Sequence, residues 1–312
     1  MEFIRGLAQL RPRHLGCVAT IGNFDGVHLG HQAVLQQLAT KAKALQLPTV
    51  VIIFEPQPQE FLIPDKAPAR LTRLREKIMV MRHHQVDRIL GLRFNPQFAN
   101  LSASDFIAQI LVKGLDIQHL VVGDDFCFGK QRQGNFATLL EAGKQHGFTL
   151  ESQKTFILGN GRVSSTRVRQ ALMQGDLQNV KTLLGRPYSL WGRIRYGQQM
   201  GRQIGFPTAN IFLHRQISPL IGVFAVLVHG LKNKPLAGVA NLGTRPTVDG
   251  HQLLLEVHLF DFDKTIYGHR VEIEFVKKLR DEQRFASFEA LKQQIIIDVQ
   301  KAKAVFGEEI RN

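Results

Sequence analysis

The stretch Gly22-Asn23-Phe24-Asp25-Gly26-Val27-His28-Leu29-Gly30-His31 decides the fold of the first half of the chain. It lies between an apolar, strand-like run over residues 16–21 and a helix-like run over residues 32–43. A strand that ends in a glycine-rich loop and leads into a helix leaves backbone N–H groups facing the crevice, and the helix dipole favours an anion there. The stretch therefore predicts a phosphate-binding turn.

Two histidines stand in this turn. His28 and His31 are three positions apart, so they share a face if the helix has begun. Imidazole N–H groups can donate to phosphate oxygens that gain charge in a transition state, and Gly30 keeps their approach free of a side chain. A zinc site and ordinary loop histidines are the alternatives, but no cysteine or carboxylate pair nearby completes four zinc ligands. The strand before the turn favours phosphate.

The length of 312 residues indicates two domains, because single hydrophobic cores rarely grow to that size. Residues 1–15 are charged and lack an apolar leader, and no run approaches the roughly 20 apolar residues of a membrane span. Cys17 and Cys127 are the only cysteines, which gives neither a disulfide framework nor a metal quartet. We expect a cytoplasmic protein that does not contact a membrane.

The net charge of +14 raises the hypothesis of nucleic-acid binding, because basic surfaces bind phosphodiester polymers. The cations are, however, scattered over both halves of the chain and do not form a basic tail. A generally positive field also steers ATP and other small anions. We therefore expect no nucleic-acid partner, and keep an RNA-binding protein of enzyme-like ancestry as the alternative class.

The first half of the chain, up to about Leu184, alternates short apolar strands with amphipathic helices. This rhythm predicts an α/β, Rossmann-like domain in which helices cover both faces of a parallel sheet and ligands bind beyond the carboxyl ends of the strands. The expected strands are residues 49–54, 87–92 and 119–123, and the expected helices are residues 70–83 and 102–113.

The pattern changes after Gly185-Arg186-Pro187, where short strands with turn signals follow one another. This half predicts a small antiparallel β-barrel. From Phe285 to Phe306 apolar residues recur at helical spacing, with Ser287 as a candidate N-cap, so a terminal helix should pack on the barrel. We expect domains over residues 1–184 and 185–312. The expected strands are residues 189–196, 223–229, 235–242, 253–260 and 271–277.

Two further loops of the first half have residues suited to ligand binding. The stretch Gly123-Asp124-Asp125-Phe126-Cys127-Phe128-Gly129-Lys130 suits a loop that folds against a ligand, although an Asp-rich turn can instead cap its own backbone. Ser164-Ser165-Thr166-Arg167-Val168-Arg169 begins a helix with hydroxyls and two arginines, which can hold a triphosphate. A simple N-cap and exposed arginines are the alternative.

In the second half, Gly201-Arg202-Gln203-Ile204-Gly205-Phe206-Pro207-Thr208-Ala209-Asn210 presents a hydroxyl and an amide oxygen two residues apart. Thr208 and Asn210 are hard oxygen ligands suited to Mg²⁺ on ATP, unless they only satisfy the loop backbone. Strand alternation places Glu256 and His258 on one face of an apolar strand. The alternative for that face is the solvent side of an edge strand.

Together these motifs resemble, end to end, the bifunctional prokaryotic riboflavin kinase/FAD synthetase family. The resemblance implies that the first domain transfers AMP from ATP to FMN, and that the second phosphorylates riboflavin. It implies Mg²⁺ with ATP, and riboflavin, FMN and FAD as substrates or products. We expect these small molecules to be the partners of the chain. We also expect the protein to be a monomer.

The resemblance also implies a role for individual residues. Asn23, His28 and His31 would meet the triphosphate, and Glu256 would be the general base toward the ribityl 5′-hydroxyl. Asp125 would border the flavin. The remaining contacts implied with nucleotide or flavin are Asp25, Gly30, Ser165, Thr166 and Arg169 in the first domain, and Gly201, Arg202, Gly205, Asn241, Arg245 and Arg280 in the second. For Arg280 a surface ion pair is the rival.

The chain departs from the family at Gln57 and Gln59, in a segment where His and Arg are common, and at Cys127, where the family has Arg. Loss of these positive or protonable groups predicts weaker binding of FMN in the first domain. The alternative function is therefore a chain in which only the kinase is active and the first domain is a degenerate flavin- or nucleotide-binding module.

Overall fold

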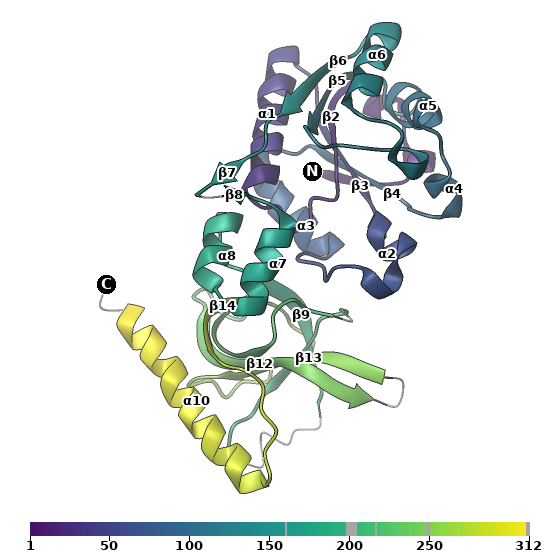
Figure 1. Ribbon diagram of the computed structural model, residues 1–312. Helices are drawn as coiled ribbons and strands as arrows, with labels where there is room; N and C mark the ends of the chain where they lie inside the picture. Colours follow the sequence, from purple (N-terminus) through teal and green to yellow (C-terminus); the bar gives the residue numbers. More distant parts are fainter. Residues whose placement is uncertain (160, 198–204, 216, 248–249, 310–312) are drawn as a thin grey trace. The chain divides into compact units, whose positions relative to one another are not determined.

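A computed structural model describes residues 1–159, 161–197, 205–215, 217–247 and 250–309 (Figure 1). Contacts within the chain group the residues into two units. The first unit consists of Met1–Pro68 and Thr72–Ser165, and the second of Ala69–Leu71 and Thr166–Asn312. Each unit contains its own main sheet.

The first unit is built on a six-stranded sheet in the order β1-β4-β3-β2-β5-β6, in which every neighbouring pair is parallel. This confirms the predicted parallel sheet, and adds an edge strand at each side that the sequence pattern did not indicate. The strand order reverses at β2 and β5, so loops that follow these two strands open onto one crevice. The strands are β1 Glu2–Arg5, β2 Cys17–Ile21, β3 Thr49–Phe54, β4 Arg88–Leu92, β5 Ile117–Gly123 and β6 Thr149–Gln153.

Helices cover both faces of this sheet, as predicted. Along β3 the side chains alternate, so Ile52 joins one core with Leu139 of α6, whereas Ile53 joins the other with Leu35 of α1. The helix expected over residues 70–83 is shorter: Arg73 is its N-cap, and the α-helix ends at Met81, where a 3₁₀ turn follows. The helical segments are α1 Leu29–Leu45, α2 Pro58–Leu62, α3 Leu74–Met81, α4 Pro96–Ala99, α5 Ala103–Phe106 with a π-helical continuation over Ile107–Val112, and α6 Phe136–His146.

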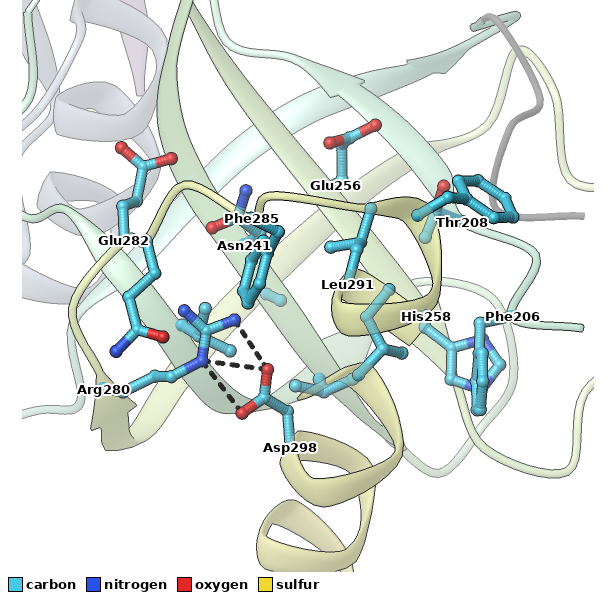
Figure 2. A pocket seen from close by; sticks show the side chains of 16 residues that line it. Phe206, Thr208, Asn241, Glu256, His258, Arg280, Glu282, Phe285, Leu291 and Asp298 are labelled. Carbon is cyan, nitrogen blue, oxygen red and sulfur yellow. Dashed lines mark hydrogen bonds and ion pairs between the residues drawn. The ribbon is translucent and has the colours of Figure 1, made fainter. Parts of the chain in front are cut away.

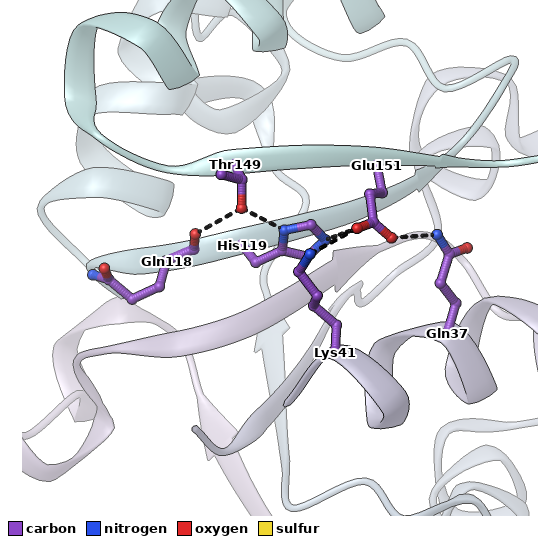
Figure 3. A network of polar contacts seen from close by, with 6 residues as sticks. All are labelled: Gln37, Lys41, Gln118, His119, Thr149 and Glu151. Carbon is purple, nitrogen blue, oxygen red and sulfur yellow. Dashed lines mark hydrogen bonds and ion pairs between the residues drawn. The ribbon is translucent and has the colours of Figure 1, made fainter. Parts of the chain in front are cut away.

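A polar network ties α1 to β5 and β6 (Figure 3). The Nδ1 of His119 lies 2.6 Å from the hydroxyl of Thr149, its register partner on β6. Lys41 and Gln37 of α1 donate to the carboxylate of Glu151, each over 2.8 Å. Burial, followed by the charge of Lys41, lowers the pKa of His119, although Glu151 opposes this shift. The network pins the last strand of the sheet to the first helix.

The polypeptide between the sheet and the barrel forms a two-stranded hairpin and two helices. The hairpin pairs β7 Ile157–Leu158 with β8 Gly161–Arg162, and α7 Ser165–Gln174 and α8 Leu177–Leu184 follow. From Thr166 onward this segment belongs to the second unit.

The second unit is a closed barrel in the order β10-β13-β12-β11-β14-β9, in which every described pair is antiparallel. The predicted barrel is confirmed, but β10, a four-residue strand that begins in the last two residues of the expected metal-binding loop, was not predicted. The strands are β9 Ser189–Arg195, β10 Ala209–Phe212, β11 Gly222–His229, β12 Leu236–Thr247, β13 Gly250–Leu259 and β14 Arg270–Arg280.

The C-terminal helix α10, Phe288–Glu309, packs against the barrel as expected (Figure 1). Ala302 and Val299 on the helix meet Val223 of β11 and Val239 of β12. Ser287 caps the helix, because its hydroxyl accepts from the backbone N–H of Ala290 over 3.2 Å. The outer surface of these strands is therefore covered by a helix.

Two neighbouring leucines of α6 test the double-faced core of the first unit. Leu139 is fully buried against the sheet, whereas Leu140 is 45% exposed. We expect Leu139→Ala to lower the free energy of unfolding of this unit by about 3 kcal/mol, because it removes buried methyl groups and leaves a cavity. Chemical denaturation measures the effect. Leu140→Ala is the matched control and should change the unfolding free energy by less than about 1 kcal/mol; equal effects would contradict this core.

Candidate active sites

The turn after β2 has an unusual backbone. Phe24, Gly26 and Val27 all have positive φ angles, of 47°, 83° and 43°. Such angles are costly for a β-branched or bulky residue and persist only where the surroundings enforce them. Phe24 and Val27 are 2% and 0% exposed, so the core holds both side chains in place. The turn is consequently a rigid one at the carboxyl end of β2.

Two residues at and before α3 clamp this turn. The N–H and hydroxyl of Thr72 donate to one carboxylate oxygen of Asp25 over 2.9 and 3.2 Å, and the N–H of Gly26 donates to the Thr72 hydroxyl over 2.9 Å. The fully buried Lys77 donates its ammonium to the backbone oxygen of Asn23. Sequence analysis missed Thr72 and Lys77, because they lie in a run whose pattern indicated only a helix.

His28 and His31 come together as predicted. His28 caps α1, since its Nδ1 accepts from the backbone N–H of His31 over 3.3 Å, and the two rings stack at 3.7 Å. A neutral His28 with an accepting Nδ1 carries its proton on Nε2, which is then a donor. A Cβ at Gly30 would lie 3.2 Å from the His28 ring, a tight contact, so a glycine at this position leaves the ring room.

Burial sets the protonation state of His31. It lowers the pKa of His31 well below 6.5, and charge on Lys77 and Arg162, and on His28 whenever that ring is protonated, lowers it further. The imidazole is therefore a neutral hydrogen-bond donor in a region where positive charge accumulates. Such a site is complementary to a polyanion.

The other predicted residues of the first site have different surroundings. The Ser165 hydroxyl donates to the backbone oxygen of Asp25 over 2.9 Å, within the first unit. Asp125 forms an ion pair with Arg162 over 2.8 Å, and both side chains are more than half exposed. Thr166 is exposed, and Arg169 donates to the backbone oxygen of Ala69 over 2.7 Å.

The three positions at which the chain departs from the family differ from one another in how far their side chains are exposed. Gln57 is 6% exposed, and its buried side-chain nitrogen has no hydrogen-bond partner in the described part of the chain. Gln59 is exposed and Cys127 is half-buried. The carboxylate of Asp124 accepts from Thr155 rather than from its own turn alone.

A cavity of about 290 Å³ lies between the outer surface of the barrel and α10 (Figure 2). Its volume is near the lower end of the range for small-molecule sites. Strands, the segment before α10 and α10 itself all contribute both polar and apolar side chains to this lining. The lining residues are Phe206, Thr208, Val223, Val239, Ala240, Asn241, Glu256, His258, Arg280, Glu282, Gln283, Phe285, Phe288, Leu291, Ile295 and Asp298.

Cross-strand pairing explains how the barrel assembles the polar part of this pocket. Glu256 on β13 is directly opposite Asn210 on β10 and Asn241 on β12. Residues directly opposite one another project from the same face of a sheet. Leu255 and Val257, which alternate with Glu256, are buried in the barrel interior. The interpretation of Glu256 as part of an edge strand is wrong, because β13 lies between two strands of a closed barrel.

The proposed metal ligands lie at the start of β10. Thr208 is half-buried and lines the pocket. The amide of Asn210 lies against Gly197, where any side chain would overlap it. Both supply hard oxygen atoms near Glu256, a donor set that fits Mg²⁺ accompanied by a nucleotide.

Arg280 points into the pocket region and is held by α10 (Figure 2). Its Nε and Nη2 donate to the carboxylate of Asp298 over 3.0 and 2.8 Å, and the guanidinium lies over the Phe285 ring at 5.7 Å. Asp298 is 3% exposed, so this is a buried ion pair and the rival interpretation of a surface pair is wrong. Asp298 carried no signal in the sequence, because it lies among apolar residues of a helix.

Some predicted residues cannot be placed. Gly201 and Arg202 lie outside the described residues. Gly205 stands in a turn at φ +85°, and Arg245 is opposite Gln252 in β12, although its side chain lies outside the described part. The zinc alternative finds no support in the described residues, which contain no group of three His, Cys, Asp or Glu side chains that could hold a metal.

The first unit is a parallel α/β unit with a histidine-bearing turn, and the second is a closed barrel with a carboxylate pocket under a helix. Together these features define a class of protein, a two-unit transferase that uses nucleotides. Family models described as FAD synthetase and riboflavin kinase match residues 10–167 and 184–306. The chain therefore belongs to the family of bifunctional riboflavin kinase/FMN adenylyltransferases.

Curated relatives match almost the whole chain. Bifunctional riboflavin kinase/FMN adenylyltransferases of Haemophilus influenzae and Escherichia coli K12 are each 51% identical, over 98% of this chain and 100% and 98% of their own lengths. A crystal structure titled Macrolide-efflux Protein from Streptococcus pneumoniae matches with a TM-score of 0.79 and 29% identity, covering 95% of this chain and 97% of that one. No helix among the described residues is long and apolar enough to cross a membrane.

The lowered pKa of the part-buried His31 gives a pH prediction. We expect His31 to stay neutral in the folded protein well below pH 6.5, the ordinary value for its pKa. The unfolded chain binds this proton near pH 6.5, so as pH falls below 6.5 the contribution of His31 to the free energy of unfolding decreases by up to about 1.4 kcal/mol per pH unit. NMR titration of the imidazole resonances measures the pKa, and a midpoint near 6.5 would contradict the burial argument.

His31→Gln is the control for the stability measurement. It removes the titrating group and should flatten the loss of unfolding free energy between about pH 6.5 and 5. His119, whose pKa is also lowered by burial, keeps its own contribution in both proteins.

Proposed function

We propose that this chain phosphorylates riboflavin to FMN and adenylylates FMN to FAD, and uses ATP for both reactions. The observation that carries the proposal is the presence of two separately built sites, the stacked histidines after β2 and the Glu256 pocket on the barrel. Curated relatives at 51% identity that have both activities in their names support it over a chain in which only the kinase is active.

In the kinase step, Glu256 accepts the proton of the ribityl 5′-hydroxyl while the oxygen attacks the γ-phosphorus of ATP. The bond between the γ-phosphorus and the bridging oxygen breaks, and ADP leaves. The register that places Glu256 between Asn210 and Asn241 supports this role. Asn241 and Arg280 orient the flavin beside the base.

Thr208 and Asn210 would hold Mg²⁺ with the nucleotide. When bound, the ion neutralises charge on the phosphate oxygens. We assign Gly201, Arg202, Gly205 and Arg245 to the same nucleotide and flavin site on the motif match alone.

In the adenylyl step, a phosphate oxygen of FMN attacks the α-phosphorus of ATP, and pyrophosphate leaves. His28 and His31 donate to phosphate oxygens that gain charge as this bond forms, so the chain contributes alignment and charge neutralisation. A rigid turn and a neutral His31 support this role, because the donors are in place before the substrate arrives.

The remaining residues of the first site follow from the motif match. Asn23, Asp25 and Gly30 shape the turn that meets the triphosphate, and Asp125 borders the flavin. Ser165, Thr166 and Arg169 contact the phosphates, and for Ser165 its bond to the backbone of Asp25 is the supporting contact.

The partners follow from the chemistry. Riboflavin, FMN and ATP are sufficient substrates, so we propose a cytoplasmic enzyme that acts as a monomer and needs neither nucleic acid nor a membrane. The free state of Cys17 and Cys127 supports a reducing compartment.

Product analysis tests the proposal directly. Incubation of the protein with riboflavin, ATP and Mg²⁺, followed by chromatography, should yield FAD by way of FMN. FMN as the final product would show a degenerate first domain. If neither FMN nor FAD formed, the result would favour the RNA-binding alternative.

Two substitutions should separate the reactions. We expect Glu256→Gln to lower FMN formation from riboflavin by about 10²- to 10⁴-fold, because the amide cannot accept the proton, while FAD formation from supplied FMN continues. His28→Ala should lower FAD formation by about 10²- to 10³-fold and leave FMN formation intact, because it removes a phosphate donor. Rates with each flavin supplied separately measure both effects. If either substitution stopped both reactions in a folded protein, the two sites would not be independent.

A further inference from the structure

His258 stands two residues after Glu256 on β13, on the same outer surface of the barrel. Both side chains line the pocket, while Val257 between them is buried inside the barrel. Figure 2 shows the His258 ring beside Phe206, on the side of the pocket opposite the pair formed by Arg280 and Asp298. The reaction scheme above leaves His258 without a role.

The ring of His258 makes one directed polar contact. Its Nδ1 lies 2.9 Å from the backbone oxygen of Pro207. A carbonyl oxygen only accepts, so Nδ1 must carry the proton and donate. The rings of Phe206 and Phe260 pack on the same ring in T-shaped arrangements, at centroid distances of 5.4 and 6.0 Å.

This contact lies where the backbone pairing of β10 with β13 stops. The pairing is Ile211 with Leu255, Asn210 with Glu256 and Ala209 with Val257. Continued by one residue, it would bring Thr208 opposite His258. Pro207 has no N–H with which to extend a ladder, so the residues before Ala209 need another attachment. The imidazole supplies it.

We propose that His258 is a positioning residue for phosphoryl transfer, which holds the Phe206–Thr208 turn against β13 and thereby keeps the Thr208 hydroxyl at a constant offset from Glu256. This inference rests on the proposed function, because it takes Thr208 as a ligand of the nucleotide's metal. A small shift of the Thr208 hydroxyl relative to Glu256 would slow the reaction, since a displacement of about 1 Å can lower the rate about 100-fold.

Three substitutions of His258 test whether the hydrogen bond to the Pro207 oxygen is required, or whether a side chain that fills the same space is enough. Alanine removes the donor. In His258→Asn the amide nitrogen occupies the position of Nδ1, whereas in His258→Gln it lies one bond farther out. The full-length protein is used, and FAD formation from supplied FMN reports that the first unit is intact in each variant.

Two measurements are made on each variant. One is the Mg²⁺ concentration that half-saturates FMN formation at saturating riboflavin and ATP. The other is hydrogen exchange at the backbone amides of Thr208 and Ala209, which requires neither metal nor substrate. We expect His258→Ala and His258→Gln to raise the half-saturating Mg²⁺ concentration about 10-fold and to speed exchange at both amides about 10-fold. His258→Asn should stay within about 3-fold of the wild type in both measurements.

Thr208→Val distinguishes failure of this inference from failure of the metal assignment. If Thr208→Val leaves the Mg²⁺ dependence unchanged, Thr208 is not a metal ligand, and the proposed function loses that residue together with this inference. If Thr208→Val raises the half-saturating concentration but His258→Ala changes neither measurement, the positioning role alone is overturned. Failure of asparagine to restore both properties would likewise overturn it.

Discussion

The register between strands of the closed barrel is the constraint on which the second site depends. Glu256 stands between Asn210 and Asn241 only because β13 is bonded to a strand on each side. A slip of β13 by one residue would turn Glu256 toward the interior, where an ionised carboxylate is costly. Closure of the barrel leaves no edge from which such a slip could begin. The covering helix α10 then makes a pocket from what would otherwise be an open surface.

The first site solves a different electrostatic problem. Donors gathered for a polyanion repel one another if all of them are charged. Here His31 is kept neutral by burial, while the ammonium of Lys77 is bonded to the backbone oxygen of Asn23 and fully buried. The carboxylate of Asp25 accepts a hydrogen bond from Thr72 and so holds the turn in place. The donors can therefore stay in place without a ligand, which is how a protein lowers the cost of reorganisation during a reaction.

The elements that sequence analysis predicted well are those with a strong local period. The buried strands β3 and β5, the helix after the glycine-rich turn and the terminal helix capped by Ser287 all lie within a few residues of their expected bounds. Strand β10 was missed because four residues are too few to show a period. Asp298 was missed because nothing near it in the chain marks its pairing with Arg280, eighteen positions away.

The sequence by itself determined the alternation of strands and helices in the first unit, the barrel of the second and the family, because these follow from neighbouring residues and from short spacings along the chain. Only the tertiary structure decided which side chains hold those motifs in shape: Thr72 on Asp25, Lys77 on Asn23 and Asp298 on Arg280. The physical reason is that hydrogen bonds and ion pairs of this kind depend on which elements pack together. Packing is settled by burial across the whole unit and leaves no local pattern to read.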